Sequence, residues 1–129
     1  MPPKAATHPA EEARLLELVN QFRSGFCAPL KLDGRLTRAA QDHSSDMADQ
    51  GYFSHTGRDG RDAAQRMRDA GYSNPGGENL AQGPRSPEDA FRMWMNSSGH
   101  RDNIMNCSYT TMGLGLDTRG WYWTQDFGR

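Results

Sequence analysis

The stretch MGLGLDTRGWYWTQDF, residues 112–127, decides the fold class because it has the pattern of a β-hairpin. Met112, Leu114 and Leu116 alternate with small or polar residues, which is the period of a half-buried strand. After a turn, a second run rich in aromatic residues returns from Trp121. The two glycines inside the first run leave room for a helix to pack closely across the predicted sheet.

Helical patterns precede this hairpin along most of the chain. Apolar residues recur at helical spacing, and Gly or Pro marks the ends of each pattern. The sequence predicts helices over residues 9–23, from 34 or 36 to 50, over 61–70 and over 86–96, and a short helical turn over 100–105. Four helices followed by a hairpin favour an α+β domain in which helices cover an antiparallel sheet.

Three segments are predicted to lack regular structure. Residues 28–30 are expected as an extended link, and Asn74-Pro75-Gly76-Gly77 as a loop. Residues 1–9 are expected as a flexible tail, followed by a single domain over 10–129. The polar, Pro-rich start has no apolar run, so we expect no signal peptide, and a mature secreted domain would look the same.

Size and charge narrow the class of protein. The chain has 129 residues, 35% of them apolar, a mean hydropathy of −0.89 and a net charge of −1. We therefore expect a modest core built from aromatic residues and methionines, and a monomer that binds no nucleic acid. No apolar run approaches the roughly 20 residues of a membrane span.

Cys27 and Cys107 are the two cysteines of the chain. Neither belongs to a CxxC pair, so a zinc knuckle or a thiol redox motif is not expected. They could be unrelated reduced thiols or one disulfide that closes a long loop, and we favour the disulfide. A structural disulfide would place the protein in an oxidising compartment.

Three short polar segments carry the candidate functional residues. His55 lies in Ser-His-Thr-Gly, Glu78 in Gly-Glu-Asn-Leu and His100 in Ser-Gly-His-Arg. Taken singly, each has an ordinary explanation: a turn histidine, a carboxylate that accepts backbone N–H bonds, and a histidine bonded to backbone. Taken together, the two histidines and the glutamate could converge on one polar pocket, because small flanking residues suit exposed turns.

The other two histidines are interpreted differently. His43 lies on the apolar face of the predicted 34–50 helix, where a half-buried histidine with satisfied hydrogen bonds is expected rather than a metal ligand. His8 falls in the predicted tail and is not a candidate.

Two neutral histidines can each give a ring nitrogen to Zn²⁺ or Cu²⁺. With fewer than four protein ligands the metal would keep open positions, so binding would be weak and exchangeable. An adjacent Glu could act as a base or orient a ligand histidine. Without metal, the same residues could still perform acid–base chemistry.

The chain resembles the CAP superfamily of cysteine-rich secretory, antigen five and pathogenesis-related proteins, also called SCP domains, and is most similar to its bacterial secreted branch. The resemblance runs from about residue 10 to residue 127. It rests on the 39–47 helix and on the pieces LVNQFR (18–23), YFSH (52–55), GENLA (77–81), WMNSSGH (94–100), MGLG (112–115) and YWTQ (122–125).

This resemblance implies a three-layer α-β-α sandwich with a central antiparallel sheet, and a cleft lined by two His and two Glu. His55, Glu78 and His100 match three of the four. The fourth should follow Trp94, where the chain has Asn-Ser-Ser and no Glu. The missing carboxylate weakens a two-acid hydrolytic mechanism and leaves a His-Glu-His set.

Three functions follow as hypotheses from the resemblance and these residues. The first is a secreted domain that binds a divalent metal such as Zn²⁺ through His55 and His100. The second is a hydrolase of peptide or cell-wall material with Glu78 as its base, although the resemblance implies no established reaction. The third is a carrier of lipid or sterol, in which aromatic and Met residues would line a groove instead of building the core.

Overall fold

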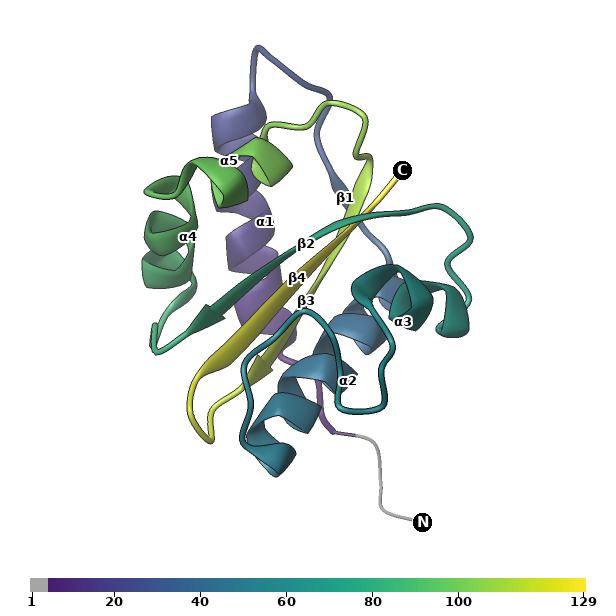
Figure 1. Ribbon diagram of the computed structural model, residues 1–129. Coiled ribbons are helices and arrows are strands. Elements are labelled where there is room, and N and C mark those ends of the chain that lie inside the picture. The colour runs from purple at the N-terminus through teal and green to yellow at the C-terminus, as the bar shows by residue number, and fades with distance from the viewer. Residues whose placement is uncertain (1–4) are drawn as a thin grey trace.

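The computed structural model describes residues 5–129, which form three layers of secondary structure (Figure 1). Five helices and four strands follow one another along the chain. In order they are α1 (Pro9–Arg23), β1 (Lys31–Leu32), α2 (Gly34–Gln50), α3 (Ala63–Asp69), β2 (Pro75–Gln82), α4 (Pro87–Met95), α5 (Ser98–Ile104), β3 (Thr111–Asp117) and β4 (Tyr122–Gly128).

The sheet has the strand order β1-β3-β4-β2. The predicted hairpin is confirmed: β3 and β4 pair antiparallel, with Met112 opposite Phe127. On its other side β4 pairs antiparallel with β2, and the two-residue β1 pairs parallel with β3 at the opposite edge. The central sheet is therefore antiparallel apart from this short edge strand.

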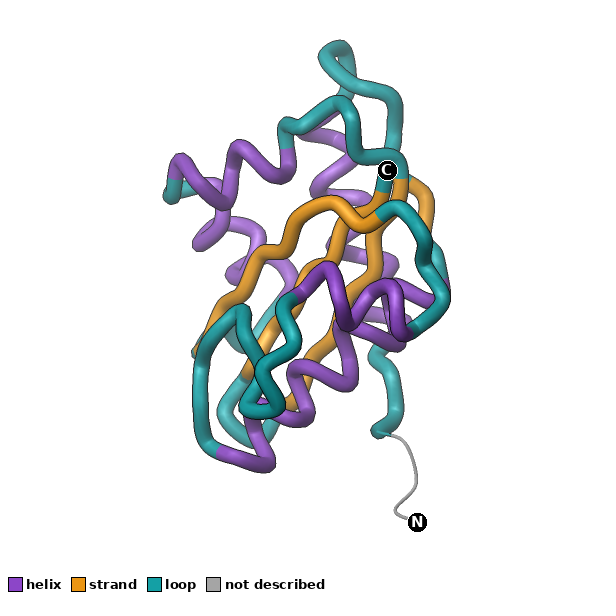
Figure 2. Tube along the Cα trace, turned by 45° about the vertical axis from the view of Figure 1, so that its right-hand side comes forward, coloured by secondary structure: helices purple, strands orange, loops and turns teal. Residues whose placement is uncertain are grey.

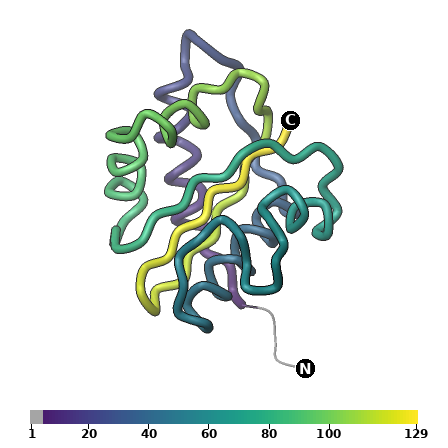
Figure 3. The backbone as a smooth tube through the Cα atoms, in the orientation of Figure 1, coloured from purple at the N-terminus to yellow at the C-terminus, as the bar shows by residue number. Residues whose placement is uncertain are grey.

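Helices cover both faces of the sheet, so the α-β-α arrangement is confirmed. Figures 1 and 3 show α1, α4 and α5 on one side and α2 and α3 on the other. The α1 side holds the larger apolar core, whose residues are buried. It includes Leu15, Val19, Trp94, Ile104, Met112, Leu114, Trp123 and Phe127.

Two glycines set the distance between α2 and the sheet. A Cβ atom on Gly113 would overlap the backbone of Thr37, and one on Gly115 would overlap the backbone of Ala40. The helix backbone thus rests directly on β3, as the two strand glycines predicted. In the hairpin register Gly113 lies opposite Asp126 of β4.

The two remaining strands were missed by the sequence analysis. The predicted loop over 74–77 is wrong, because Pro75–Gln82 forms β2, with a register irregularity between Pro75 and Glu78. An edge strand tolerates Pro because its outer side needs no backbone donor. The predicted helices are confirmed with small shifts at their ends, and the turn over 100–105 is α5, which begins at Ser98.

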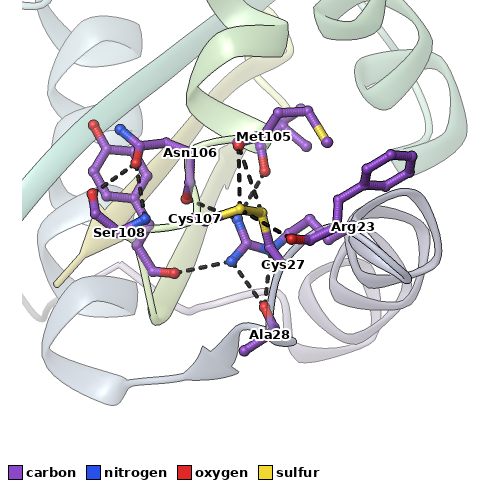
Figure 4. Close-up of a disulfide and its surroundings, with 10 residues drawn as sticks. Arg23, Cys27, Ala28, Met105, Asn106, Cys107 and Ser108 are labelled. Atoms are coloured by element: carbon purple, nitrogen blue, oxygen red, sulfur yellow. Dashed lines mark hydrogen bonds between the residues drawn. A yellow bond between two sulfur atoms is a disulfide. The ribbon is translucent and has the colours of Figure 1, made fainter.

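The predicted disulfide is present and joins the turn after α1 to the segment after α5. Cys27 and Cys107 are bonded with their Cα atoms 5.0 Å apart, across 80 residues of chain (Figure 4). Closing so long a loop restricts the unfolded chain and stabilises the fold by about 4 kcal/mol in the chain-entropy model.

Arg23 lies beside this disulfide and is completely buried (Figure 4). Its guanidinium donates to four backbone carbonyls at 2.9–3.2 Å, those of Ala28, Ile104, Asn106 and Tyr109. Burial lowers the pKa of Arg23. Because Ile104 is the last residue of α5, the cation also satisfies the carbonyl end of that helix.

The predicted tail over 1–9 lies partly outside the described residues, which begin at Ala5. Its last residue, Pro9, is the first residue of α1, and the Ala5 carbonyl accepts a 2.8 Å hydrogen bond from Arg38. Among residues 5–129 no helix combines the length and the apolar character that crossing a membrane requires.

Candidate functional site

His55 and Glu78 come together, as the sequence analysis anticipated. His55 lies in the connection between α2 and α3, which folds back beside α2 (Figure 2), and Glu78 lies on β2. The His55 Nδ1 is 2.9 Å from the Glu78 Oε1. Because a carboxylate can only accept, Nδ1 is the nitrogen that carries hydrogen, and Nε2 keeps its lone pair. The His55 side chain is 59% exposed and that of Glu78 is 2% exposed, so the imidazole covers the carboxylate and itself meets solvent.

Arg66 of α3 holds the other side of Glu78. Its Nη2 donates to the Glu78 Oε2 at 2.6 Å, and its Nη1 donates to the His55 carbonyl at 2.6 Å. The arginine is 6% exposed, yet its Nε has no hydrogen-bond partner among the described residues. One guanidinium therefore fixes both the carboxylate and the backbone that carries the histidine.

Asp126 of β4 lies directly opposite Glu78 in the β2–β4 pairing. It is fully buried, and neither carboxyl oxygen accepts a hydrogen bond from a donor in residues 5–129. Burial and the neighbouring negative charge of Glu78 raise the pKa of Asp126 well above its ordinary value.

Glu78 is held in the opposite state. Burial alone would raise its pKa, but the hydrogen bond from His55 and the charge of Arg66 lower the pKa of Glu78 to about 2. The pKa values of these two adjacent carboxyls are thus shifted in opposite directions, which favours an ionised Glu78 beside a protonated Asp126. Such a pattern is typical of carboxyls that share a proton.

His100 lies in the first turn of α5, the helix that packs beside β2. Its carbonyl accepts a 3.2 Å bond from Asn79, and Asn103 in turn donates to the Glu78 carbonyl at 3.2 Å. These amides fasten α5 to the strand that carries Glu78. Burial, and the nearby positive charge of His55 when it is protonated, lower the pKa of His100, so this imidazole is neutral at pH 7. Its Nδ1 is buried without a partner in the described part of the chain.

His43 is a satisfied core histidine, as the sequence indicated, although it is fully rather than half buried. It is 2% exposed, and its Nε2 lies 2.7 Å from the Ser54 carbonyl, to which it donates. Burial is the main cause that lowers the pKa of His43 and keeps it neutral. The bond fixes the residue before His55, so His43 supports the site from α2.

Two groups that can bind a metal, the imidazoles of His55 and His100, remain from the sequence prediction. The residues after Trp94 end α4 at Met95 and supply no acid, in line with the sequence. Across residues 5–129, no three His, Cys, Asp or Glu side chains are grouped so that they could share a metal ion. The His55 side chain is largely exposed and keeps its Nε2 lone pair free, with Glu78 behind it, whereas the unpartnered Nδ1 of His100 is buried.

A polar hollow of about 230 Å³ is lined in part by Arg66. Its walls include Asp42, His43, Asp46 and Arg61, and no apolar aromatic residue. Among the large apolar side chains, Trp94, Trp123 and three methionines (Met47, Met67 and Met112) are buried in the core, whereas Phe22, Phe26, Phe53 and Met93 are exposed.

Sequence analysis did not identify Arg66 or Asp126. Arg66 sits in a charged stretch with three other arginines and aspartates nearby, so nothing singled it out. A usable signal did exist for Asp126. It is a carboxylate inside a strand of otherwise apolar and uncharged residues, and a charge in a central strand is rarely buried without a reason.

Comparison with known proteins places this geometry in a family. The model of the cysteine-rich secretory protein family, CAP, matches residues 16–127. The Bacillus subtilis protein YkwD is 38% identical over 92% of this chain and 47% of its own length. An extracellular protein with an SCP domain from Bacillus anthracis is 31% identical, with a TM-score of 0.86 over 94% of this chain and 41% of its own.

A third similarity concerns the fold alone. An outer surface protein from Borrelia burgdorferi superposes with a TM-score of 0.84 at 19% identity, over 100% of this chain and 98% of its own. Against YkwD and the Bacillus anthracis protein, by contrast, the chain spans less than half of the relative's length.

Proposed function

The chain belongs to the cysteine-rich secretory protein (CAP) family, and on that premise we propose that it is a secreted domain that binds a divalent metal ion such as Zn²⁺ between His55 and His100. The contact that carries the proposal is the 2.9 Å bond from His55 to Glu78. A carboxylate behind a histidine fixes its tautomer and raises its basicity as a ligand. The Cys27–Cys107 disulfide supports an extracellular location, because disulfides persist in oxidising compartments.

His100 adds the second ligand in this proposal. Its pKa is lowered by burial, so at neutral pH it needs no deprotonation before it coordinates a metal. Two protein ligands leave the remaining positions to water, so the site is open and the ion exchangeable. A bound Zn²⁺ would supply Lewis acidity and lower the pKa of its water.

Titration calorimetry with ZnCl₂ on tag-free protein tests this site. We expect weak one-to-one binding that is lost in His55→Ala and in His100→Ala. Glu78→Gln should weaken binding about tenfold, because it removes the orienting carboxylate.

His8→Ala is the matched control, because His8 lies before α1 and its ring lies 3.6 Å from the carboxylate of Glu11. It should bind Zn²⁺ like the wild type. Equal affinity in the wild type and in the His55→Ala/His100→Ala double variant would reject the proposed site.

A hydrolase is the second candidate, with Glu78 as base, and one observation weighs against it. A general base works best when its pKa lies near the working pH, whereas that of Glu78 is lowered to about 2. Turnover of peptide or cell-wall material that disappears in Glu78→Gln, without loss of fold, would support the hydrolase. A lipid carrier has less support, because Trp94, Trp123 and Phe127 are packed in the core.

A further inference from the structure

We propose that Asp126 is the second acid of this site: a buried, neutral carboxylic acid that donates its hydrogen to Glu78 and thereby positions the Glu78 carboxylate toward His55. This goes beyond the metal-binding proposal and does not depend on it, since every contact involved lies within the chain. Asp126 is a positioning residue, because it has no exposed surface with which to touch a ligand.

Strand pairing brings the two carboxyls together. Glu78 and Asp126 are direct partners across β2 and β4, and opposite residues of an antiparallel pair point to the same face. That face is covered by α2 and α3. On the next strand the partner of Asp126 is Gly113, whose missing side chain lets the α2 backbone close over this part of the sheet.

Two of the four carboxyl oxygens of this pair accept hydrogen bonds, and a third gains a partner only if one of the two acids is protonated. The Glu78 oxygens accept from His55 and Arg66, whereas both Asp126 oxygens lack any donor among residues 5–129. An ionised Asp126 would be a buried charge without a partner beside a second buried negative charge, which is strongly unfavourable. A protonated Asp126 needs no donor on one oxygen and makes a charge-assisted bond to Glu78 with it.

The surrounding charges favour the same state. Glu78 faces Asp126 from β2 and Arg66 acts on it from α3, whereas His43 of α2 and His55 lie near Glu78. Arg66 is the one permanent cation of this group, and its bond goes to Glu78. The positive charge of Arg66 therefore balances the negative charge of Glu78. An ionised Asp126 would give the buried part of the cluster a net negative charge.

The consequence is a carboxyl pair that keeps a single negative charge. Glu78 receives hydrogen bonds from three directions, so its carboxylate cannot rotate away from His55. The acid that the family resemblance places after Trp94 is absent here, and Asp126 supplies a second carboxyl from the neighbouring strand β4.

Asp126→Asn is the decisive variant, because the amide can donate to Glu78 but cannot ionise. In the wild type a raised folded-state pKa means that stability is lost as pH rises from the unfolded-state pKa toward the folded-state value. We therefore expect Asp126→Asn to fold, and its urea midpoint relative to the wild type to increase steadily between pH 4 and pH 8.

Asp117→Asn is the matched control with the opposite expected sign. Asp117 is also buried on the sheet, but the hydrogen bonds and charge of Arg119 outweigh burial and lower its pKa. The urea midpoint of Asp117→Asn relative to the wild type should fall as pH rises toward the ordinary value of 3.8 and then stay level up to pH 8. If the relative urea midpoint of Asp126→Asn likewise falls or stays level between pH 4 and pH 8, Asp126 is ionised in the folded protein and the proposal is rejected.

Infrared spectroscopy gives an independent reading. We expect a carbonyl stretch of a protonated carboxylic acid in wild-type protein at pH 7, absent from Asp126→Asn and retained in Asp117→Asn. The positioning role is tested by the NMR signal of the His55 Nδ1–H. That signal should persist in Asp126→Asn and exchange at least tenfold faster with water in Asp126→Leu, which fills the site without a donor. Absence of the infrared band, or an unchanged Nδ1–H signal in Asp126→Leu, would overturn the proposal.

Discussion

Two buried arginines, one on each side of the sheet, show how differently this fold treats a charge removed from water. Arg23, beside the disulfide, makes five hydrogen bonds, all to backbone carbonyls. Arg66, beside His55, pairs with Glu78, and its Nε has no partner in the described residues. The first region contains no titrating partner, whereas the second combines an arginine, two carboxyls and two histidines.

The difference separates a structural region from a functional one. A guanidinium whose donors are all satisfied by backbone fixes chain segments and responds to nothing in solution. A cluster of coupled ionisable groups holds protons that can shift, and such clusters are typical of functional sites. Changes near Arg23 should therefore alter stability alone, and changes near Arg66 should alter protonation and ligand binding first.

Arg23→Met should have the largest effect on stability. It leaves the carbonyls of Ala28, Ile104, Asn106 and Tyr109 without their donor, and we expect a loss of about 5 kcal/mol in the free energy of unfolding. Urea denaturation measures it. Arg23→Lys is a milder variant for the case that Arg23→Met is too unstable to purify. It should lose about 3 kcal/mol, because three N–H donors cannot reach all four carbonyls. A loss below about 1 kcal/mol in either variant would contradict the structural role.

Removal of the disulfide tests the same region. The Cys27→Ser/Cys107→Ser variant should lose about 4 kcal/mol, mainly through the entropy of the 80-residue loop in the unfolded chain. Its Zn²⁺ affinity at a temperature where it remains folded should equal that of the wild type. A changed affinity would show that the two regions are coupled.

Acidification tests the region around Arg66, because it protonates Glu78. The folded-state pKa of Glu78 is lowered from 4.5 to about 2, so its contribution is fully present above pH 4.5 and is lost as pH falls toward 2. The loss should be roughly 3 kcal/mol at the acid limit. Urea midpoints measured between pH 2 and pH 5 should show this slope in the wild type and a shallower slope in Glu78→Gln. Parallel slopes would mean that other carboxylates carry the acid sensitivity.

Arg66→Lys should have the smallest effect on stability and sharpens the comparison with Arg23→Lys. An ammonium can still reach Glu78 and the His55 carbonyl, so we expect a loss of about 1 kcal/mol. The Zn²⁺ affinity should nevertheless drop, because a flexible ammonium no longer holds the Glu78 carboxylate and the His55 backbone in one fixed geometry. A stability loss as large as that of Arg23→Lys, with unchanged Zn²⁺ affinity, would reverse the assignment of the two regions.

Much of the fold could be predicted because its signals are local. The hairpin follows from alternation at Met112, Leu114 and Leu116, and the close contact with α2 follows from the glycines between them. The strand β2 could not be predicted, since Pro75 and two glycines have the composition of a loop. What makes them a strand is the free edge of β4, a tertiary feature that overrides local preference.

The site divides in the same way. His55, Glu78 and His100 carry side-chain types that suggest chemistry in any sequence, and the contact between His55 and Glu78 was anticipated. Arg66 and Asp126 gain their roles only from the packing of α3 and from the register of β4 against β2. No spacing along the chain encodes such a register, because 48 residues separate Glu78 from its strand partner.

Gly113 affects the solvation of a neighbouring side chain as well as the distance between α2 and the sheet. By admitting the α2 backbone, it replaces solvent with peptide groups next to the carboxyl on the adjoining strand. A methyl group there would push the helix away from the sheet, and water that then reached Asp126 would lower the pKa of its carboxyl. The pKa of Asp126 on β4 thus depends on the absence of a Cβ atom at Gly113 on the neighbouring strand β3.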